Sequence, residues 1–252
     1  PGNLLEPKRA GIILMKVLGI IPARFGSSRF PGKPLIDIKG KTMIQRVYEG
    51  ASRCEELSQV IVATDDERIY THVQSFGGKV MMTSNLHGSG TERCAEVAAH
   101  FPEMEIVVNI QGDEPLVNPS QLSQLIQAFQ HENVEIATLV SPKIDSTELT
   151  IPNRIKVVID HEQNALFFSR SRIPSGMFSS NYIALKHIGL YAFRNDVLRK
   201  LVSLPATELE KSESLEQLRW LYYGYKIKTI ETHIETPNID TPEDLEAVLK
   251  RL

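Results

Sequence analysis

The sequence predicts an α/β protein with a mostly parallel sheet that is covered by helices on both faces. Three continuous apolar runs, at residues 17–21, 60–64 and 106–110, are typical of strands that are buried on both sides. A polar or charged residue stands within three positions after each run, and helical patterns separate the runs. Strands and helices that alternate in this way build a parallel sheet between two layers of helices.

The first half of the chain supplies most of these elements. Helices are expected at residues 42–54, 67–76, 91–100 and 119–131, with a short strand at 80–82. Thr42 and Asn118 are suitable N-caps for the first and last of these helices. Pro119 suits the first position of a helix, because the N–H that proline lacks would have no partner there.

The second half changes character. Strands expected at 136–140, 155–159 and 165–168 are interpreted as an inserted antiparallel lobe, with a hairpin at 161–164. A strand at 187–193, a helix at 214–223, a strand at 227–234 and a helix at 242–249 complete the chain. We predict a single domain over residues 15–252. Residues 1–14 lack the apolar core of a signal peptide and are interpreted as a remnant of expression or an upstream extension.

Composition narrows the functional classes. The 252 residues carry a net charge of -3, which gives no support for binding to nucleic acid or to a membrane surface. No apolar run approaches the roughly 20 residues that a transmembrane helix needs. Cys54 and Cys94 are too few for a disulfide framework or a cysteine-based zinc site, and they favour the reducing cytoplasm.

A cationic loop follows the first expected strand. Residues 22–35 combine Gly and Ser with Arg24, Arg29 and Lys33, a composition that suits a polyanion such as a nucleoside triphosphate. The loop is not a Walker A motif, because Lys33 is followed by Pro34. A solvated basic loop and a phosphate-binding loop are about equally good interpretations, since loops at the ends of parallel strands often carry the sites of α/β proteins.

Two aspartates are candidate metal ligands. Asp113 lies just past the strand at 106–110, at the sheet edge where the cationic loop is also expected. Asp113 taken alone slightly favours an Asx turn. Because carboxylates beside bound phosphates commonly hold Mg²⁺, the cationic loop nearby makes a metal ligand the better interpretation. Asp240 is ambiguous, because Asp240 and Thr241 before a helix also make an ordinary helix start.

Several further residues have both a structural and a functional interpretation. Arg170 follows an apolar strand and could bind a carboxylate, although a surface arginine is the commoner explanation there. Arg93 opens a helix after a Gly/Ser loop, where backbone amides can meet a ligand and where helix capping is an equally good explanation. By default His187 is a structural histidine, Gln111 a turn residue and the Glu216–Gln217 pair a polar helix face. The residues alone indicate a Mg²⁺-dependent α/β enzyme that uses a nucleotide.

Eight motifs extend this interpretation. In chain order they are IIPARFGSSRFPGKPL, IVATDDERI, SGTERCAEV, VVNIQGDEP, ALFFSRSRIP, KHIGLYAFR, LEQLRWL and IDTPEDLEAV. Together they cover nearly all of residues 15–252 and closely resemble the 3-deoxy-manno-octulosonate (Kdo) cytidylyltransferases, or CMP-Kdo synthetases. The opening motif is shared with CMP-sialate and other sugar nucleotide synthetases, whereas NIQGDEP, FSRSRIP with HIGLY, and LEQLR point to Kdo.

The resemblance implies a Rossmann-like nucleotidyltransferase sheet and a specific reaction. The anomeric hydroxyl of Kdo attacks the α-phosphate of CTP with the help of Mg²⁺, and pyrophosphate leaves. The product, CMP-Kdo, serves lipopolysaccharide synthesis. The family also implies a homodimer whose substrates are the small molecules CTP and Kdo.

The resemblance further implies roles for matching residues. Arg24 and Lys33 would neutralise the triphosphate, and Asp113 and Asp240 would be the Mg²⁺ ligands, which makes these four the expected catalytic set. The nucleotide-binding positions would be Pro22, Ala23, Arg24, Ser27, Ser28, Arg29, Lys33 and Arg93. The Kdo pocket would be lined by Gln111, Arg170, His187, Tyr191, Glu216 and Gln217.

One departure and two alternatives accompany the resemblance. Between Pro174 and Lys186 the family usually carries a longer, charged loop than the SGMFSSNYIAL found here. The acceptor could instead be another keto sugar acid, such as sialate or 8-amino-Kdo. A non-catalytic nucleotide-binding protein is the other alternative; it would be expected to lose Lys33, Asp113 or Asp240, and all three are present.

Overall fold

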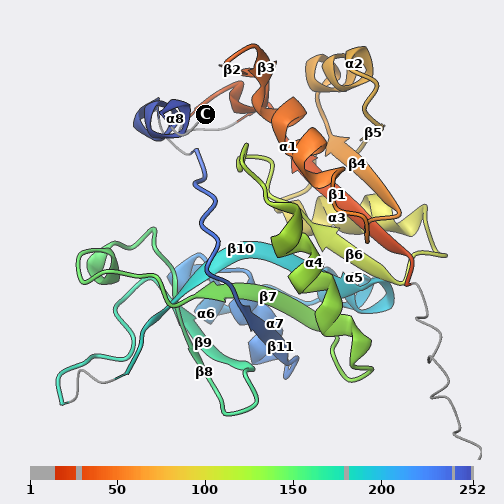
Figure 1. Ribbon diagram of the computed structural model, residues 1–252. Coiled ribbons are helices and arrows are strands. Elements are labelled where there is room, and N and C mark those ends of the chain that lie inside the picture. The colour runs from red at the N-terminus through yellow and green to blue at the C-terminus, as the bar shows by residue number, and fades with distance from the viewer. Residues whose placement is uncertain (1–14, 27–29, 179–181, 240–241, 251–252) are drawn as a thin grey trace, which may run out of the picture.

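The computed structural model describes residues 15–26, 30–178, 182–239 and 242–250, apart from the side chains of 242, 243 and 247. At its centre lies a nine-stranded sheet whose main path runs β11, β7, β10, β6, β1, β4, β5 (Figure 1). These strands are β1 (Val17–Ala23), β4 (Gln59–Thr64), β5 (Val80–Met82), β6 (Ile106–Asn109), β7 (Ile136–Ser141), β10 (Leu185–Arg194) and β11 (Ile227–Glu231). Four pairs of neighbouring strands are parallel, namely β1 with β4, β1 with β6, β4 with β5, and β7 with β11. β10 is antiparallel to its two neighbours in this path, β6 and β7. The predicted mostly parallel α/β class is confirmed.

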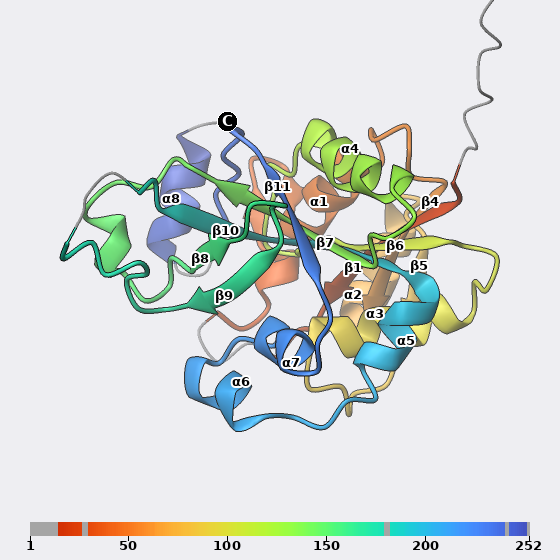
Figure 2. The ribbon, with the colours of Figure 1, turned by 90° about the horizontal axis from the view of Figure 1, so that it is seen from below.

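Helices cover both faces of this sheet (Figure 2). They are α1 (Met43–Ala51), α2 (Glu67–Ser75), α3 (Gly90–Ala99), α4 (Pro119–Gln127), α5 (Asn195–Leu201), α6 (Glu208–Glu213), α7 (Gln217–Tyr222) and α8 (Pro242–Leu249). α1, α2 and α4 pack in one core, and α3, α5 and α7 in the core on the other face. Ile21 belongs to the first core and Ile20 to the second, because successive side chains of a strand point to opposite faces. This two-sided burial explains why the strands are continuous apolar runs.

Local sequence signals set the starts of the helices. The Thr42 hydroxyl accepts a hydrogen bond from the Gln45 amide at 3.4 Å, and the Asn118 side chain accepts one from the Ser120 amide at 2.9 Å. Both N-caps agree with the sequence prediction. Short 3₁₀ turns lie at Lys33–Leu35, Ala128–Gln130 and Glu148–Thr150, and a separate hairpin pairs β2 (Asp37–Ile38) with β3 (Lys41–Thr42).

The inserted lobe is smaller than predicted. The strand expected at 136–140 is β7, which lies inside the main sheet between β11 and β10, so its assignment to the lobe was wrong. All of β7 is buried, and the apolar run therefore has the same physical cause as in β1. The lobe is the antiparallel pair of β8 (Lys156–Ile159) and β9 (Ala165–Ser169), with β8 also pairing with the start of β10.

The helix expected at 214–223 is shorter than predicted and corresponds to α7, and the preceding helix α6 was not predicted. α6 is followed by its C-cap Ser214, whose φ of 51° is left-handed, and α7 begins three residues after Ser214. Thr207 and Glu210 form a capping box that starts α6, a Thr-x-x-Glu signal that the prediction did not use. The break matters for the site, because Leu215 and Gln217 on its far side line a cavity at the carboxyl edge of the sheet.

β10 contains a bulge opposite β7. Between Ile188 and Tyr191 the register advances three residues in β10 but one residue in β7, so two residues of β10 are extra. Within this irregular stretch, the rings of His187 and Tyr191 lie in contact at a centroid distance of 5.3 Å.

An extended segment, residues 232–239, links β11 to α8 (Figure 1). Ile239 and Val248 pack with Ile38 and Met43 in a small third core, which places α8 beside β2 and β3. The C-terminal part of the chain thereby returns to the region that follows β1. No helix within the described residues is long and apolar enough to span a membrane.

Candidate active site

Two cavities open at the carboxyl edge of the sheet. The first cavity, of about 350 Å³, is lined by the ends of β1 and β6, by Lys33 and by the loop before α3. The second cavity, of about 540 Å³, lies between β10, the β7–β8 connection and the 232–239 segment. Gln111 and Asp113 line both, so the cavities meet at the turn after β6. This edge is where α/β sheets bind their ligands.

The loop after β1 folds back on itself. The Gly32 amide donates to the Phe25 carbonyl oxygen at 3.0 Å, and Gly32 has a φ of 73°, which favours glycine. The Phe25 ring packs against Gly32 and carries the Arg68 guanidinium carbon 3.3 Å from its centroid. Four of the expected nucleotide-binding residues line the first cavity from this loop and its strand, namely Pro22, Ala23, Arg24 and Lys33.

Lys33 connects this loop with two other segments. Its Nζ donates to Asp113 Oδ2 at 2.8 Å and to the Ile239 carbonyl oxygen at 2.7 Å. The Ile239 amide donates to the Asp113 carbonyl oxygen at 2.9 Å. The structure thus brings Lys33 and Asp113 together, and an ammonium and a carboxylate stand side by side where the cavities meet.

Gly112 makes the close approach of β1 and the turn after β6 possible. A Cβ at residue 112 would lie 2.8 Å from the Pro22 carbonyl oxygen, which is closer than real Cβ contacts come. The missing side chain therefore allows Asp113 to lie directly beside the start of the cationic loop.

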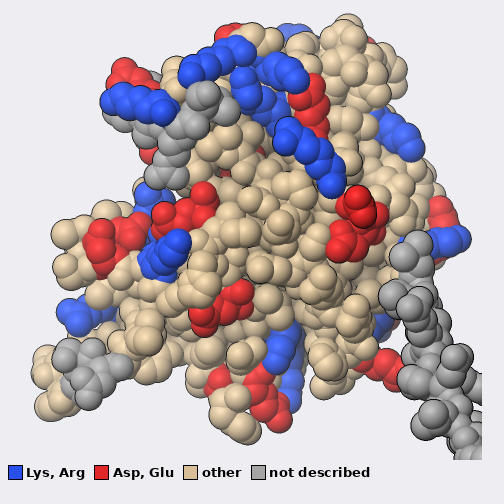
Figure 3. Space-filling view, viewed as in Figure 1, with Lys and Arg blue, Asp and Glu red and all other residues tan. Residues whose placement is uncertain are grey.

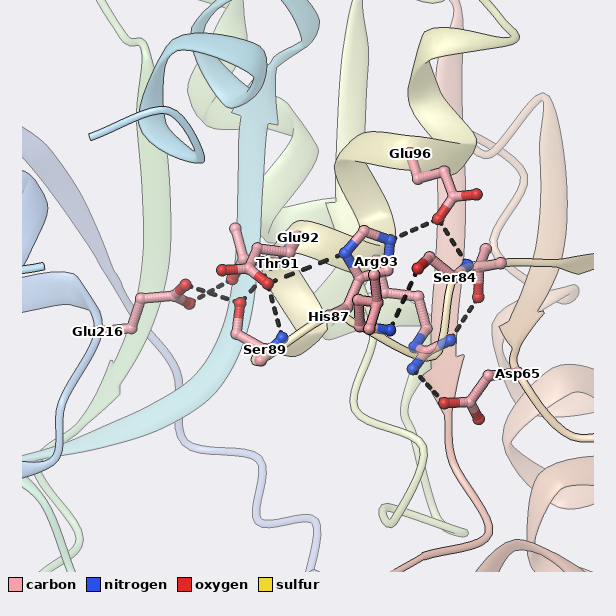
Figure 4. A network of polar contacts seen from close by, with 12 residues as sticks. Asp65, Ser84, His87, Ser89, Thr91, Glu92, Arg93, Glu96 and Glu216 are labelled. Carbon is pink, nitrogen blue, oxygen red and sulfur yellow. Dashed lines mark hydrogen bonds and ion pairs between the residues drawn. The ribbon is translucent and has the colours of Figure 1, made fainter. Parts of the chain in front are cut away.

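Arg93 is a buried cation in the wall of the first cavity (Figure 4). Its Nη2 donates to Asp65 Oδ2 at 2.8 Å, and its Nη1 donates to the Thr83 hydroxyl. A buried guanidinium needs such acceptors, because an unpaired buried charge is costly. The role near a nucleotide that the resemblance implies for Arg93 stays a prediction.

Carboxylates of α3 hold the loop that precedes this helix (Figure 4). The Gly88 amide donates to Glu92 Oε2 at 2.7 Å, and His87 Nε2 contacts Glu96 Oε2. Because residues 87–90 line the first cavity, these contacts fix one of its walls. His87 and Gly88 belong to none of the motifs in the sequence, so their position in the cavity wall could not be predicted. It depends on how the loop packs against α3.

His187 and Tyr191 form one wall of the second cavity. His187 Nε2 lies 3.0 Å from the Thr138 hydroxyl, and that hydroxyl donates to the Leu190 carbonyl oxygen at 2.8 Å. The pattern assigns the proton of the neutral ring to Nε2 and leaves Nδ1 as an acceptor. Burial lowers the pKa of His187 to about 3, so the ring is neutral near pH 7.

Two amide side chains complete this part of the second cavity. Gln111 Nε2 donates to the carbonyl oxygen of Gly189, which lies in the bulge of β10, at 2.8 Å. Gln217, at the start of α7, is buried. The structure therefore brings four of the six expected pocket residues, Gln111, His187, Tyr191 and Gln217, to one cavity.

Arg170 does not line either cavity within the described part of the chain. Its guanidinium donates to three backbone carbonyl oxygens, those of Glu213 at 2.6 Å, Pro152 at 3.2 Å and Ser214 at 3.1 Å. These contacts favour a structural role, and the carboxylate-binding role that the resemblance implies for Arg170 stays a prediction. Its donors tie the lobe to the turn between α6 and α7.

Glu216 is likewise absent from the described lining of both cavities. Its carboxylate accepts hydrogen bonds from the Ser89 hydroxyl at 2.8 Å and the Thr91 hydroxyl at 2.5 Å, at the start of α3 (Figure 4). Burial raises the pKa of this carboxyl, and the two hydroxyls oppose that effect.

Charged residues that the sequence did not mark also line the second cavity. Arg154 Nε lies 3.2 Å from Glu148 Oε1, and Lys186 Nζ lies 3.4 Å from the same oxygen. Glu114 is buried, and burial followed by the charge of Asp113 raises its pKa to about 8, so this carboxyl is protonated near pH 7. Arg154 lies on an irregular connection whose approach to β10 depends on the tertiary fold.

Four of the expected site residues lie outside the described residues, namely Ser27, Ser28, Arg29 and Asp240. The expected cap Thr241 and residues 1–14 also lie outside them.

In the view of Figure 3, Lys and Arg side chains gather over β2, β3 and α1, while both signs of charge are interspersed elsewhere.

The chain was compared with known proteins. A family model described as cytidylyltransferase matches residues 18–230. The 3-deoxy-manno-octulosonate cytidylyltransferase of Parabacteroides distasonis is 50% identical over 94% of this chain and 98% of its own length. The 8-amino-3,8-dideoxy-manno-octulosonate cytidylyltransferase of Shewanella frigidimarina is 47% identical over 94% of this chain and 99% of its own length. A solved structure of CMP:2-keto-3-deoxy-manno-octonic acid synthetase complexed with CTP superposes with a TM-score of 0.90 at 46% identity, over 94% of this chain and 98% of that one. The chain therefore belongs to the cytidylyltransferase family, in the group that contains the 3-deoxy-manno-octulosonate enzymes.

Proposed function

We propose that this protein transfers the cytidylyl group of CTP to Kdo, with CMP-Kdo and pyrophosphate as products, and so serves lipopolysaccharide synthesis. The observation that carries the proposal is the meeting of two cavities at Gln111 and Asp113, beside the Lys33 ammonium. A cation-lined cavity suits a triphosphate, and an adjoining cavity rich in amide and ring groups suits a polyhydroxylated acid. The similar structure complexed with CTP supports the nucleotide half of the proposal.

The first cavity is the proposed CTP site. Arg24, Lys33 and Arg93 supply positive charge to its lining, and the start of α3 presents backbone amides beside Ser89. The second cavity is the proposed acceptor site. There the Gln111 and Gln217 amides and the Nδ1 acceptor of His187 match sugar hydroxyls, which both donate and accept hydrogen bonds.

The reaction needs positioning and charge stabilisation more than covalent chemistry. The anomeric oxygen of the acceptor forms a bond to the α-phosphorus, the bond from that phosphorus to the β-phosphate oxygen breaks, and the hydroxyl proton passes to solvent. Lys33 stands at the junction of the cavities, where it would stabilise negative charge that develops on the phosphates. Ser27, Ser28 and Arg29 remain proposed members of the same loop.

Asp113 fits a ligand of Mg²⁺. Its side chain is 26% exposed at the junction of the cavities and offers hard oxygen atoms. Among the described residues no group of three or more His, Cys, Asp and Glu could hold a metal by itself, which suits an ion that keeps water and phosphate oxygens as ligands. Asp240 is the second proposed ligand. When bound, the ion would neutralise charge on the phosphates.

Three further expectations stay proposals. We propose a homodimer from the family resemblance, which light scattering coupled to gel filtration would test. A cytoplasmic location is supported by two free, buried thiols, Cys54 and Cys94. A single domain over residues 15–252 is supported by the continuity of the nine-stranded sheet across both halves of the chain.

Pyrophosphate release from CTP with Mg²⁺ tests the proposal. The assay compares Kdo, 8-amino-Kdo, sialate and no acceptor. We expect release with Kdo to exceed release with every other acceptor. Stronger release with another acid would keep cytidylyl transfer and overturn the acceptor, and no release from folded protein that binds CTP would favour a non-catalytic nucleotide-binding protein.

8-Amino-Kdo is the second candidate acceptor, because the relative from Shewanella frigidimarina that carries this name is 47% identical. The second cavity contains Glu148 and Glu235, which could attract the ammonium group of this acceptor. Lys186 Nζ lies 3.4 Å from both carboxylates and Arg154 Nε lies 3.2 Å from Glu148, so two cations already accompany these two carboxylates and less charge is left for an ammonium group from the substrate.

A further inference from the structure

Glu216 joins the walls of the two cavities (Figure 4). Its Oε1 accepts from the Ser89 hydroxyl at 2.8 Å, and its Oε2 accepts from the Thr91 hydroxyl at 2.5 Å. Ser89 lines the first cavity, whereas Leu215 and Gln217, on either side of Glu216, line the second. The Glu216 carboxylate therefore connects the wall of the first cavity with the wall of the second, and 125 residues of sequence separate it from Thr91.

Packing alone would not favour a carboxylate at this position. Burial raises the pKa of Glu216, which shows that desolvation opposes its charge. Hydrogen bonds return only part of such a cost, and apolar residues of similar size often stabilise a fold as well or better. The two hydroxyls and the amino end of α3 hold the charge in one place and orientation.

Glu216 also acts on the second cavity through its charge. After burial, the negative charge of Glu216 is the next cause that raises the pKa of Tyr191. Tyr191 lines the second cavity. A displaced Glu216 carboxylate would therefore change the surroundings of Tyr191 at the same time as it released Ser89.

We propose that Thr91 is a positioning residue for cytidylyl transfer, which acts through Glu216 to hold the nucleotide and acceptor cavities in their relative positions. The inference rests on the proposed function. Thr91 is 4% exposed and lines neither cavity in the described part of the chain, so its hydroxyl reaches the site only through Glu216. If this link is lost, the two walls can shift against one another, and each substrate must then order its own wall on binding, which weakens the binding of both substrates.

A matched pair of variants tests this role. Thr91→Val keeps the β-branched shape and removes the hydroxyl donor, whereas Thr91→Ser keeps the donor. We expect Thr91→Val to raise the KM for CTP and the KM for the acceptor, each by roughly tenfold, the size of one hydrogen bond to a charged group. Thr91→Ser should keep both KM values near those of the unmodified enzyme.

A purely structural role predicts a different result. It would lower the folded fraction, and with it kcat per mole of protein, but both KM values would stay unchanged. Unchanged KM values in Thr91→Val, or a rise for one substrate only, overturn the inference. If Thr91→Val does not fold, Glu216→Gln replaces it with the same expected rise in both KM values and the same overturning result.

The unmodified enzyme separates this inference from the proposed function. If it releases no pyrophosphate with any of the acceptors, the proposed function fails before the variants are compared. If it turns over and Thr91→Val has the KM values of the unmodified enzyme, the proposed function stands and the inference fails.

Discussion

The Lys33 ammonium lies 2.8 Å from Asp113 Oδ2, although 80 residues separate the two in sequence. The pair lies where the two cavities meet, and Lys33 Nζ also donates a hydrogen bond to the Ile239 carbonyl oxygen. A cation that is already oriented toward a carboxylate needs little rearrangement when phosphates arrive. The charges at this boundary are therefore the most sensitive point of the proposed mechanism.

Asp113→Asn should abolish turnover and leave the fold intact. The amide keeps the size of the side chain but removes the charge that would hold Mg²⁺, and loss of a charge-stabilising group costs on the order of 10²-fold in kcat or more. Pyrophosphate release measures the activity, and thermal unfolding checks the fold. Asp196→Asn is the control, since Asp196 is an exposed aspartate whose partner is Lys200. An active Asp113→Asn enzyme would remove Asp113 from the metal role.

Protein stability should fall between about pH 6.5 and pH 3 because of His187. Above this range the imidazole is neutral in the folded and unfolded states. Within it, the unfolded chain binds a proton that the folded protein excludes, because burial lowers the pKa of His187 to about 3. Between about pH 7 and about pH 5, the proton uptake of His187 in the unfolded chain lowers the free energy of unfolding by up to about 2 kcal/mol.

Urea unfolding at these two pH values, for the unmodified protein and for His187→Gln, measures the effect of His187. The glutamine variant should lose less stability between the two pH values, and comparison within each protein cancels any loss of packing. An equal loss in both proteins would show that His187 takes up its proton in the folded state.

Arg170→Ala should lower stability rather than acceptor affinity. The variant removes hydrogen bonds to three backbone carbonyl oxygens and should cost about 1 to 3 kcal/mol of unfolding free energy. Arg53→Ala, at an exposed arginine, is the control and should have little effect. A raised KM for the acceptor at unchanged stability would restore Arg170 as a carboxylate ligand.

Gly112→Ala should lower both activity and stability. Its Cβ would lie 2.8 Å from the Pro22 carbonyl oxygen, so β1 and the turn that carries Asp113 must move apart. Overpacking of this kind costs about 1 to 3 kcal/mol. Gly26→Ala is the matched control for stability, because its Cβ would meet nothing within 4 Å. Equal melting temperatures in the two variants would contradict this account of Gly112.

Local patterns carried much of the fold prediction. Burial on both faces produces continuous apolar runs, which located β1, β4 and β6, and Thr42 and Asn118 marked the starts of two helices. The same reasoning failed for β7, because an apolar run shows that a strand is buried on both faces but does not show which strands it pairs with. Ser214 escaped notice, since its left-handed conformation follows from packing and not from a glycine.

The site was predictable to the extent that its residues follow strands. Lys33 and Asp113 could be placed at one sheet edge because the carboxyl ends of parallel strands meet there. Arg170 could not be placed, because a guanidinium suits a ligand carboxylate and backbone carbonyl oxygens equally well. Arg154 reaches the second cavity from a connection without periodicity, and Glu114 is buried by the 232–239 segment, which is remote in sequence.

The bulge in β10 limits how this protein can vary in length. Its two extra residues leave every later residue of the strand on the face it would occupy without them, so Ala192 and Phe193 still reach opposite cores. A change of two residues at the bulge keeps the alternation of faces, whereas a change of one residue keeps it only if a one-residue bulge absorbs the change. Insertions or deletions of two residues can therefore reshape the wall around His187 and leave both cores unchanged.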